Sequence, residues 1–273
     1  MRRIPVGLLR TWFVMACCAG SGCAPALMKL PGEPGVPAPD FATTYLEATR
    51  ACKPVSSMTA EIGVTGSVSG QRLRARILAG FKAPSARLEA VAPFGGPLFV
   101  FVATGKDATL LLPRDDRVVE HADAAEVLEA IAGVRLGPSD LLQALTGCAS
   151  PVNWGNPQAI GDQWRTAAGT GGSKIYLKRD TTSGPWRVVA ILFPGPGLQP
   201  DWRAEYSQFR NDLPGAVRLV ASDRQRFDLS LTLTQVEVNT QLAPDVFRVD
   251  VPASARPMSI DELRNARPGA GKD

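Results

Sequence analysis

The side chains best suited to covalent or metal chemistry are few, because the chain holds five cysteines and one histidine. Thiolates and imidazoles are common nucleophiles and zinc ligands in proteins. With His121 as the single histidine, the sequence excludes metal sites built from several histidines and argues against histidine-based catalysis. Three cysteines fall within the first 23 residues, whereas Cys52 and Cys148 stand alone further along. The cysteines therefore favour processing and cross-linking over an active site.

Other catalytic patterns are also missing from the sequence. It contains no G-x-S-x-G, no Walker A motif and no G-x-G-x-x-G that opens a helix. Asp115 and Asp116 form a carboxylate pair, but Arg114 and Arg117 flank them, which is typical of a solvated hairpin tip. His121 is expected to be a surface or capping residue. We therefore predict no enzyme activity, no catalytic residue, no metal site and no cofactor.

The composition is that of an ordinary globular protein: 273 residues and 29.0 kDa, with 45% hydrophobic and 21% charged residues. The formal net charge is +4. Arg2, Arg3 and Arg10 lie in a segment expected to be removed, which leaves +1, three less than the whole chain. A nearly neutral mature chain gives no electrostatic reason to expect nucleic-acid binding.

Residues 1–22 have the parts of an export signal. Two arginines precede a short apolar stretch, and small residues lead up to Cys23. The sequence Gly20-Ser21-Gly22-Cys23 resembles the lipobox of bacterial lipoproteins, in which the cysteine becomes the lipid-modified N-terminus. Cys17 and Cys18 are rival acceptors, and an ordinary cleaved signal is the plainer alternative. We predict a lipoprotein signal peptide over residues 1–22, with lipid attachment at Cys23.

Two further cysteines remain in the mature chain. An even number in an exported protein suggests a disulfide. A disulfide between Cys52 and Cys148 would stabilise the folded chain by about 4–5 kcal/mol, according to the chain-entropy relation for a loop of this length. The alternative is two buried free thiols. We predict that the pair is bonded and ties the first helix to the end of the third.

Composition and periodicity divide the chain into four parts. Residues 23–40 hold five prolines and are expected to form a tether with nothing to bury. Residues 41–257 are expected to form one mostly antiparallel β domain, with a helix at its start and two in its middle. Residues 258–273 are expected to be a polar tail with one helical turn at residues 260–263.

The strands and helices that define the domain follow from apolar spacing. Arginines alternate with apolar residues over 72–77, and leucines alternate with polar residues over 227–234, so each segment is predicted to be a strand with one apolar face. An apolar stripe over 122–134 predicts the first inner helix. Pro138 is expected to open the second, with Gly147 as its C-cap.

One stretch carries a family resemblance. A strand at 87–91 is followed by A-P-F-G-G-P-L-F-V, by H-A-D before the first inner helix, by G-V-R-L after it, and by a second helix that ends L-T-G-C. This order resembles the LolB family of outer-membrane lipoprotein receptors. The later segment T-Q-V-E-V-N-T-Q-L-A-P-D-V-F-R-V-D-V-P is similar to the end of the wider LolA-like carrier superfamily. The resemblance covers about residues 58–252.

The resemblance implies a mainly β (α+β) fold: an unclosed antiparallel β-barrel in which an N-terminal helix and two inserted helices lid an apolar cavity. In the family that cavity holds the acyl chains of lipoproteins. An acyl chain offers nothing to hydrogen-bond, so only a shaped apolar hollow can hold it, at about 0.8 kcal/mol per buried CH₂. Ordinary core packing is the alternative for every apolar strand residue. The residues predicted to line the cavity are Leu88, Phe99, Phe101, Leu229, Leu231 and Leu233.

The resemblance also assigns a role to one loop. The family carries an exposed leucine in a P-L-G turn, which is thought to engage the membrane during lipoprotein insertion. The matching position here is Phe94, within Pro93-Phe94-Gly95-Gly96-Pro97. We predict that Phe94 is exposed and contacts the membrane; the alternative is that it folds back into the mouth of the barrel.

Together these features predict an outer-membrane lipoprotein, lipid-anchored and facing the periplasm, that binds lipidated cargo and helps insert lipoproteins into the outer membrane. Its expected partners are lipoprotein acyl chains, a periplasmic lipoprotein carrier and outer-membrane lipid, without nucleic acid. A structural or assembly accessory of the cell envelope on the same scaffold is the alternative. A periplasmic hydrolase is the third possibility, and the missing catalytic motifs disfavour it.

Overall fold

The computed structural model describes residues 26–32, 34–92, 96–148, 154–194 and 200–266, and fifteen strands lie within them. In chain order the strands are β1 Val36–Pro37, β2 Ser57–Val68, β3 Gln71–Lys82, β4 Ser85–Val91, β5 Pro97–Thr104, β6 Asp107–Leu112, β7 Arg117–Asp123, β8 Gly155–Ile160, β9 Trp164–Ala168, β10 Lys174–Lys178, β11 Arg187–Pro194, β12 Pro200–Ser207, β13 Ala216–Ala221, β14 Phe227–Val238 and β15 Arg256–Pro257.

Helices occur at the two ends and in the middle of the described chain. They are α1 Phe41–Ala48, α2 Ala124–Ala132, α3 Pro138–Thr146 and α4 Ile260–Ala266, with short 3₁₀ turns η1 Thr170–Gly172 and η2 Pro244–Phe247. None of these helices has the length and apolar character needed to cross a membrane, within the part of the chain described.

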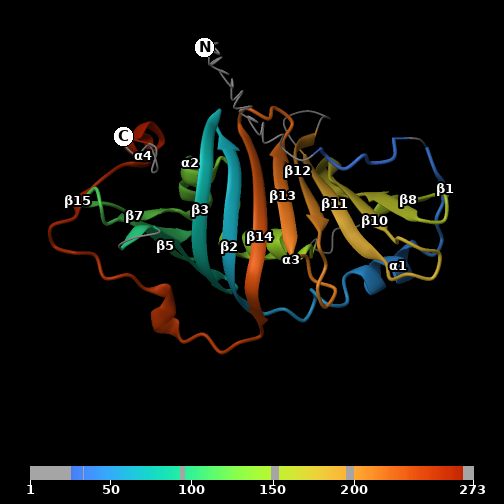
Figure 1. Cartoon of the computed structure of the whole chain (residues 1–273), viewed down its shortest axis with the longest axis horizontal. Coiled ribbons are helices and arrows are strands. Elements are labelled where there is room, and N and C mark those ends of the chain that lie inside the picture. Colours follow the sequence, from blue (N-terminus) through green and yellow to red (C-terminus); the bar gives the residue numbers. More distant parts are fainter. Residues whose placement is uncertain (1–25, 33, 93–95, 149–153, 195–199, 267–273) are drawn as a thin grey trace, which may run out of the picture.

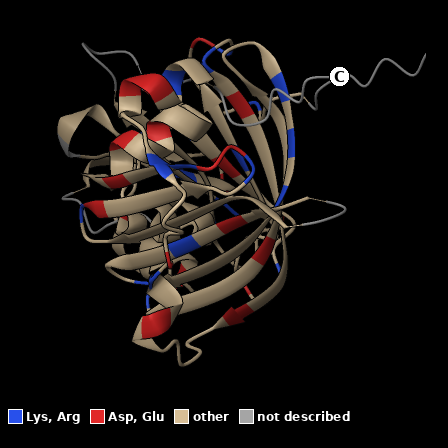
Figure 2. Ribbon diagram, turned by 90° about the vertical axis from the view of Figure 1, so that its left-hand side faces the viewer, with Lys and Arg blue, Asp and Glu red and all other residues tan. Residues whose placement is uncertain are grey.

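All strands join one sheet, in the order β1-β8-β9-β10-β11-β12-β13-β14-β2-β3-β4-β5-β6-β7-β15. Neighbours are antiparallel except for the parallel pair of β7 and β15. The sheet curls strongly, with α2 and α3 on one side of it (Figures 1 and 2). The outermost strands β1 and β15 do not pair with each other, so the sheet stays open. This confirms the predicted unclosed, mainly β fold.

The predicted alternation of apolar residues sets the inner face of the sheet. Leu229 and Leu231 are buried on β14, and Leu231 pairs with Val64 of β2, which in turn pairs with Ala75 of β3. Leu219 of β13 pairs with Leu229. These registers place apolar side chains from four adjacent strands in one continuous patch.

Gly66 allows β2 and β14 to approach each other closely. Its φ is +144°, and a Cβ atom added there would lie 1.9 Å from the carbonyl oxygen of Asp228. No residue with a side chain could occupy this position without moving the strands apart.

Strand β5 is apolar on both faces because residues 249–255, near the C-terminal end of the described chain, cover its outer face. Val100 and Val102 point away from the inner face and, with Leu111 and Val118, form a separate cluster. Val249, Val251 and Ala255 pack against this cluster from outside the sheet. Arg87 holds the segment down by donating to the carbonyl oxygens of Val246 (3.3 Å) and Arg248 (2.9 Å).

The proline-rich segment packs on the sheet instead of extending away from it. Met28 and Leu30 pack on the outer face against Tyr176 and Val189, and the backbone N–H of Met28 donates to Glu205 (3.0 Å). Further along the segment, β1 pairs with β8. The expectation that residues 23–40 bury nothing is therefore wrong for the described residues 26–32 and 34–40, where Met28 and Leu30 pack on the sheet and Ala38 is buried. The reason is that two long apolar side chains find complementary apolar side chains on the sheet.

The end of the domain also differs from the predicted polar tail. Met258 is buried, Leu263 is fully buried, and α4 packs beside α2. Ser259 and Glu262 cap this helix reciprocally: Ser259 N–H donates to the Glu262 carboxylate (2.7 Å), and Glu262 N–H donates to Ser259 Oγ (3.2 Å). The hydrogen bonds from Ser259 lower the pKa of Glu262, and Arg117 adds to this effect.

Candidate functional site

Helices α2 and α3 roof the inner face of the sheet. Asp123 caps the start of α2 by accepting from the backbone N–H groups of Ala125 and Glu126, both at 3.1 Å. Gly133 ends α2 with a φ of 73°. Helix α3 begins with Pro138 and ends at a left-handed glycine C-cap, as predicted from the sequence. Two short, firmly capped helices are thereby laid across the sheet, where α3 contacts β3 and β4 and α2 contacts β6 and β7.

A hollow of about 130 Å³ lies between these helices and the sheet; we call it the apolar cavity. Every side chain around it is hydrocarbon or aromatic. The sheet contributes Ile62, Val64, Leu73, Ala75, Ile77, Leu88, Phe99, Leu219, Leu229 and Leu231. Helices α2 and α3 contribute Leu128, Ile131, Ala132, Leu141 and Leu145, and the connection between them contributes Val134 and Leu136.

The size and lining of this cavity define what it can hold. A buried water needs roughly 10–15 Å³ and two to four polar partners, which the lining does not offer. Engineered apolar cavities of about 150 Å³ stay dry and bind benzene. The hollow is therefore suited to a short piece of hydrocarbon as it stands. A longer chain requires α2 and α3 to move away from the sheet.

Four of the six residues predicted to line the cavity do so: Leu88, Phe99, Leu229 and Leu231. Phe101 and Leu233 share the inner face with them but do not line the hollow, and their side chains are 0% and 2% exposed in the packed core. The alternation of apolar and polar residues shows on which face of a strand a side chain lies. Whether that side chain lines the cavity or belongs to the packed core depends on where α2 and α3 lie along the strand.

The residues with which α2 and α3 line the cavity could not be assigned to it individually from the sequence. Leu128 and Ile131 of α2 and Leu141 and Leu145 of α3 belong to the apolar stripes that identify these helices in the sequence. The same spacing would suit a helix packed on a solid core. Only the gap left between the helices and the sheet distinguishes the two arrangements.

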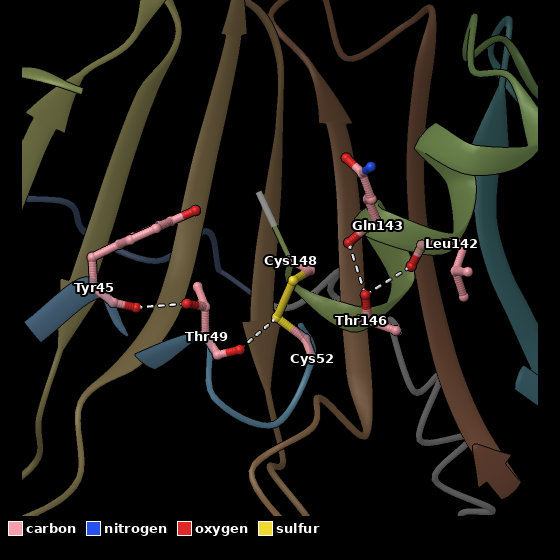
Figure 3. The surroundings of a disulfide bond; sticks show 7 residues. All are labelled: Tyr45, Thr49, Cys52, Leu142, Gln143, Thr146 and Cys148. Carbon is pink, nitrogen blue, oxygen red and sulfur yellow. Dashed lines mark hydrogen bonds between the residues drawn. A yellow bond between two sulfur atoms is a disulfide. The ribbon is translucent and has the colours of Figure 1, made fainter. Parts of the chain in front are cut away.

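A disulfide between Cys52 and Cys148 fastens one end of the roof (Figure 3). The two Cα atoms are 5.5 Å apart, and the bond joins the turn after α1 to the residue that follows the C-cap of α3. Thr49 Oγ1 donates to the carbonyl oxygen of Tyr45 (2.7 Å) on one side. On the other, Thr146 Oγ1 donates to the carbonyl oxygen of Leu142 (2.9 Å). Both threonines reinforce the helix ends that the disulfide connects.

No charged residue lines the apolar cavity. Elsewhere along the described chain, basic and acidic residues are interspersed (Figure 2). The most buried pair is Arg218 and Asp228 on the outer face, where two nitrogen–oxygen contacts of 2.9 Å form a bidentate bond. Burial alone would raise the pKa of Asp228, but the hydrogen bonds from Arg218 and Arg224 outweigh it and lower that pKa. No group of three or more His, Cys, Asp or Glu side chains that could hold a metal occurs among the described residues.

Two predicted site residues, Cys23 and Phe94, lie outside the residues that the structure describes. Lipid attachment at the first and membrane contact by the second stay predictions. His121, expected to be a surface or capping residue, is exposed, with Nδ1 3.4 Å from Asp107, while Asp123 provides the cap.

No protein-family model matches the sequence, and no curated protein matches it. Solved structures do resemble the fold. A LolA superfamily protein from Nitrosomonas europaea gives a TM-score of 0.54 at 13% identity, over 76% of this chain and 97% of that chain. A DUF1329 family protein from Desulfovibrio piger gives 0.52 at 10% identity, over 76% and 96% of the respective chains. The fold of this chain is therefore similar to that of the LolA superfamily protein.

Proposed function

We propose that this protein is an envelope lipoprotein that binds the acyl chains of lipidated cargo in the apolar cavity and helps insert lipoproteins into the outer membrane. The single observation that carries the proposal is the composition of the cavity: all seventeen lining residues are apolar. Each methylene moved from water into such a site contributes about 0.8 kcal/mol. A hydrocarbon chain is therefore the ligand class that this lining favours most.

The finer parts of the proposal rest on the sequence. The signal-like residues 1–22 and Cys23 support anchoring by lipid, and Ala24 is compatible with sorting to the outer membrane, because aspartate at that position is the familiar inner-membrane retention signal. The resemblance to LolB supports delivery of cargo from a periplasmic carrier to outer-membrane lipid. Intact mass of the protein extracted from membranes tests the anchor: it should begin at Cys23 and carry acyl mass.

Site-specific photo-crosslinking tests cargo binding directly. A benzophenone side chain at Ile131, which lines the cavity from α2, should label the acyl chains of lipoproteins in intact envelopes. The same group at Leu46, which is 57% exposed on α1, is the matched control and should label none. Labelling of an envelope protein's polypeptide by both variants, without acyl adducts, would support the assembly-accessory alternative instead.

A further inference from the structure

The outer face of β3 carries three arginines that alternate with residues of the cavity lining. Arg72, Arg74 and Arg76 are all exposed, and we call them the basic stripe. Leu73 and Ala75, between them, line the apolar cavity. Successive side chains of a strand point to opposite faces, so the arginines lie on the outside of the sheet. A partner bound by the basic stripe is therefore separated from the cavity by the thickness of the sheet alone.

The positive charge of the basic stripe exceeds the negative charge around it. Arg76 is bonded to Glu61 (2.8 Å). Within the described part of the chain, neither Arg72 nor Arg74 forms an ion pair or a side-chain hydrogen bond. Asp228 lies on the same face of β14, but it is already bonded to two other arginines. The basic stripe thus presents two guanidinium groups that an external anion can neutralise.

Hydroxyl groups accompany these two guanidinium groups. Arg74 pairs across the strands with Thr65, and Arg72 pairs with Ser67. Ser230 of β14 pairs with Thr65 from the other side. Cross-strand pairs share a face of the sheet, so the hydroxyls lie beside the arginines. Guanidinium and hydroxyl groups both donate hydrogen bonds to phosphate oxygens, which makes a phosphate group a suitable partner.

The basic stripe lies at the end of β3 where the sheet is least covered. Strand β4 ends at Val91, which pairs with Arg76. Among the described residues, the part of β3 before Arg76 has β2 as its single neighbouring strand. The upper ends of β2 and β3 rise beyond β5 and β7 (Figure 1). The loop that carries Phe94 follows β4, so the residue predicted to contact the membrane leaves the sheet beside the basic stripe.

The start of the mature chain is held on the same outer face. The backbone N–H of Met28 donates to Glu205 (3.0 Å). One row of cross-strand pairs joins that contact to the basic stripe: Glu205, Arg218, Ser230, Thr65 and Arg74. Four strand spacings make this row about 19 Å long. Cys23 is five residues before Met28, and five extended residues span at most about 18 Å. A lipid anchor at Cys23 therefore keeps the outer face close to the bilayer.

We propose that the basic stripe docks on anionic phospholipid headgroups of the membrane to which the protein is anchored. The arginines attract the headgroup phosphates, and the hydroxyls of β2 add hydrogen bonds to them. Docking holds the upper end of β2 and β3 against the bilayer, with the apolar cavity directly behind. The inference rests on the proposed function, because it assumes an anchor in the envelope, and it adds a lipid partner that binds outside the cavity.

Co-sedimentation with vesicles tests the proposal on the full mature chain. Cys23→Ser removes the acyl anchor, so that binding reports the protein surface alone. This anchor-free chain should bind phosphatidylcholine vesicles with about one third phosphatidylglycerol roughly tenfold more tightly than pure phosphatidylcholine vesicles. Adding Arg72→Gln and Arg74→Gln should weaken binding to the anionic vesicles roughly 25-fold, about fivefold for each arginine. Raising NaCl from about 0.05 to 0.5 M should remove most of the preference.

A matched control removes the same charge at the other end of β3. Lys53 precedes β2, and Lys106 lies between β5 and β6; both are exposed. The start of β2 pairs with Lys82, at the end of β3 opposite to the basic stripe. Lys53→Gln with Lys106→Gln should therefore leave binding to the anionic vesicles at the level of the anchor-free chain.

The outcomes separate this inference from the proposed function. Equal binding to both kinds of vesicle, or an anionic preference that survives the loss of Arg72 and Arg74, overturns the inference. Binding of a polyglutamate peptide through these arginines, without binding to anionic vesicles, would assign the surface to an acidic protein and also overturn it. Uptake of a fluorescent fatty acid tests the apolar cavity separately and should be the same with and without the two arginines. If the anchor-free chain takes up no fatty acid, the proposed function fails, whatever the vesicles show.

Discussion

Cys148, next to the C-cap of α3, is covalently joined to Cys52, 96 residues earlier in the chain. The bond fixes the C-terminal end of α3 to the segment that follows α1. Helix α1 itself packs over β9, β10 and β11. The connection to α2, by contrast, runs through the five residues 133–137, which carry no such bond. Any opening of the roof that admits a longer chain should therefore displace α2 and the start of α3 more than the end of α3.

Removing the disulfide should lower stability. For the double variant Cys52→Ser, Cys148→Ser, the chain-entropy relation gives a loss of about 4–5 kcal/mol in the free energy of unfolding. For a domain of this size, that corresponds to a fall in Tm of roughly 10–15 °C by calorimetry. The wild-type protein treated with a reductant is the control, and its Tm should equal that of the double variant. Finding both thiols free by non-reducing peptide mapping of the mature protein would contradict the premise.

The bond between Arg218 and Asp228 should make stability depend on acid pH. The pKa of Asp228 is lowered in the folded protein, so its contribution is complete above the ordinary aspartate pKa and is lost as pH falls through the lowered value. At neutral pH, Asp228→Asn should reduce the free energy of unfolding by about 2 kcal/mol, because it weakens charge-assisted hydrogen bonds of side chains that are 12% and 9% exposed.

Denaturant unfolding at several pH values measures this effect. The difference in the free energy of unfolding between the wild type and Asp228→Asn should become smaller as the pH falls from 5 to about 2. Asp261→Asn is the control, because its bond to Arg264 is exposed on α4 and should contribute under about 1 kcal/mol at any pH. A gap that stays constant down to pH 2 would mean that Asp228 is not the group titrating.

The inner face of the sheet could be predicted because it depends on local alternation. Leu73, Ala75 and Ile77 of β3 point to the same face as Leu229 and Leu231 of β14, as their spacing indicates. The outer face was less predictable. Val100 and Val102 make β5 apolar on both sides, and their cover arrives from a segment about 150 residues later in the chain. Alternation within one strand carries no information about such distant partners.

The unpartnered hydroxyl of Tyr206 lies beyond what the sequence could reveal, for a related reason. Tyr206 follows Trp202 and Ala204 at inward positions of β12, and in the sequence it reads as one more core residue. Its distinctive property is a buried hydroxyl without a hydrogen-bond partner among the described residues. Missing partners arise from three-dimensional packing, so they leave no trace in periodicity.

Filling the apolar cavity should block chain binding without unfolding the protein. Ala132→Phe adds a ring to the hollow from the last residue of α2. Uptake of a fluorescent fatty acid should fall at least tenfold, because the added ring occupies much of the 130 Å³. Ala42→Phe is the matched control, since Ala42 is exposed on α1 and the change in helix propensity is the same. Undiminished uptake by a well-folded Ala132→Phe would place the bound chain elsewhere.

The last prediction separates delivery of cargo from binding and concerns Phe94, which lies outside the described residues. If this side chain contacts the membrane, Phe94→Glu places a charge where the loop must enter lipid, at a cost of a few kcal/mol. Thermal stability should change little, because an exposed loop residue contributes little to folding. Fatty-acid uptake should also persist, since the apolar cavity is lined by other residues. Transfer of a lipidated peptide into liposomes should fail. Leu46→Glu, an equally charged change on exposed α1, should transfer normally. If Phe94→Glu unfolds the domain, Phe94 belongs to the core; if transfer continues at the wild-type rate, insertion does not proceed through this loop.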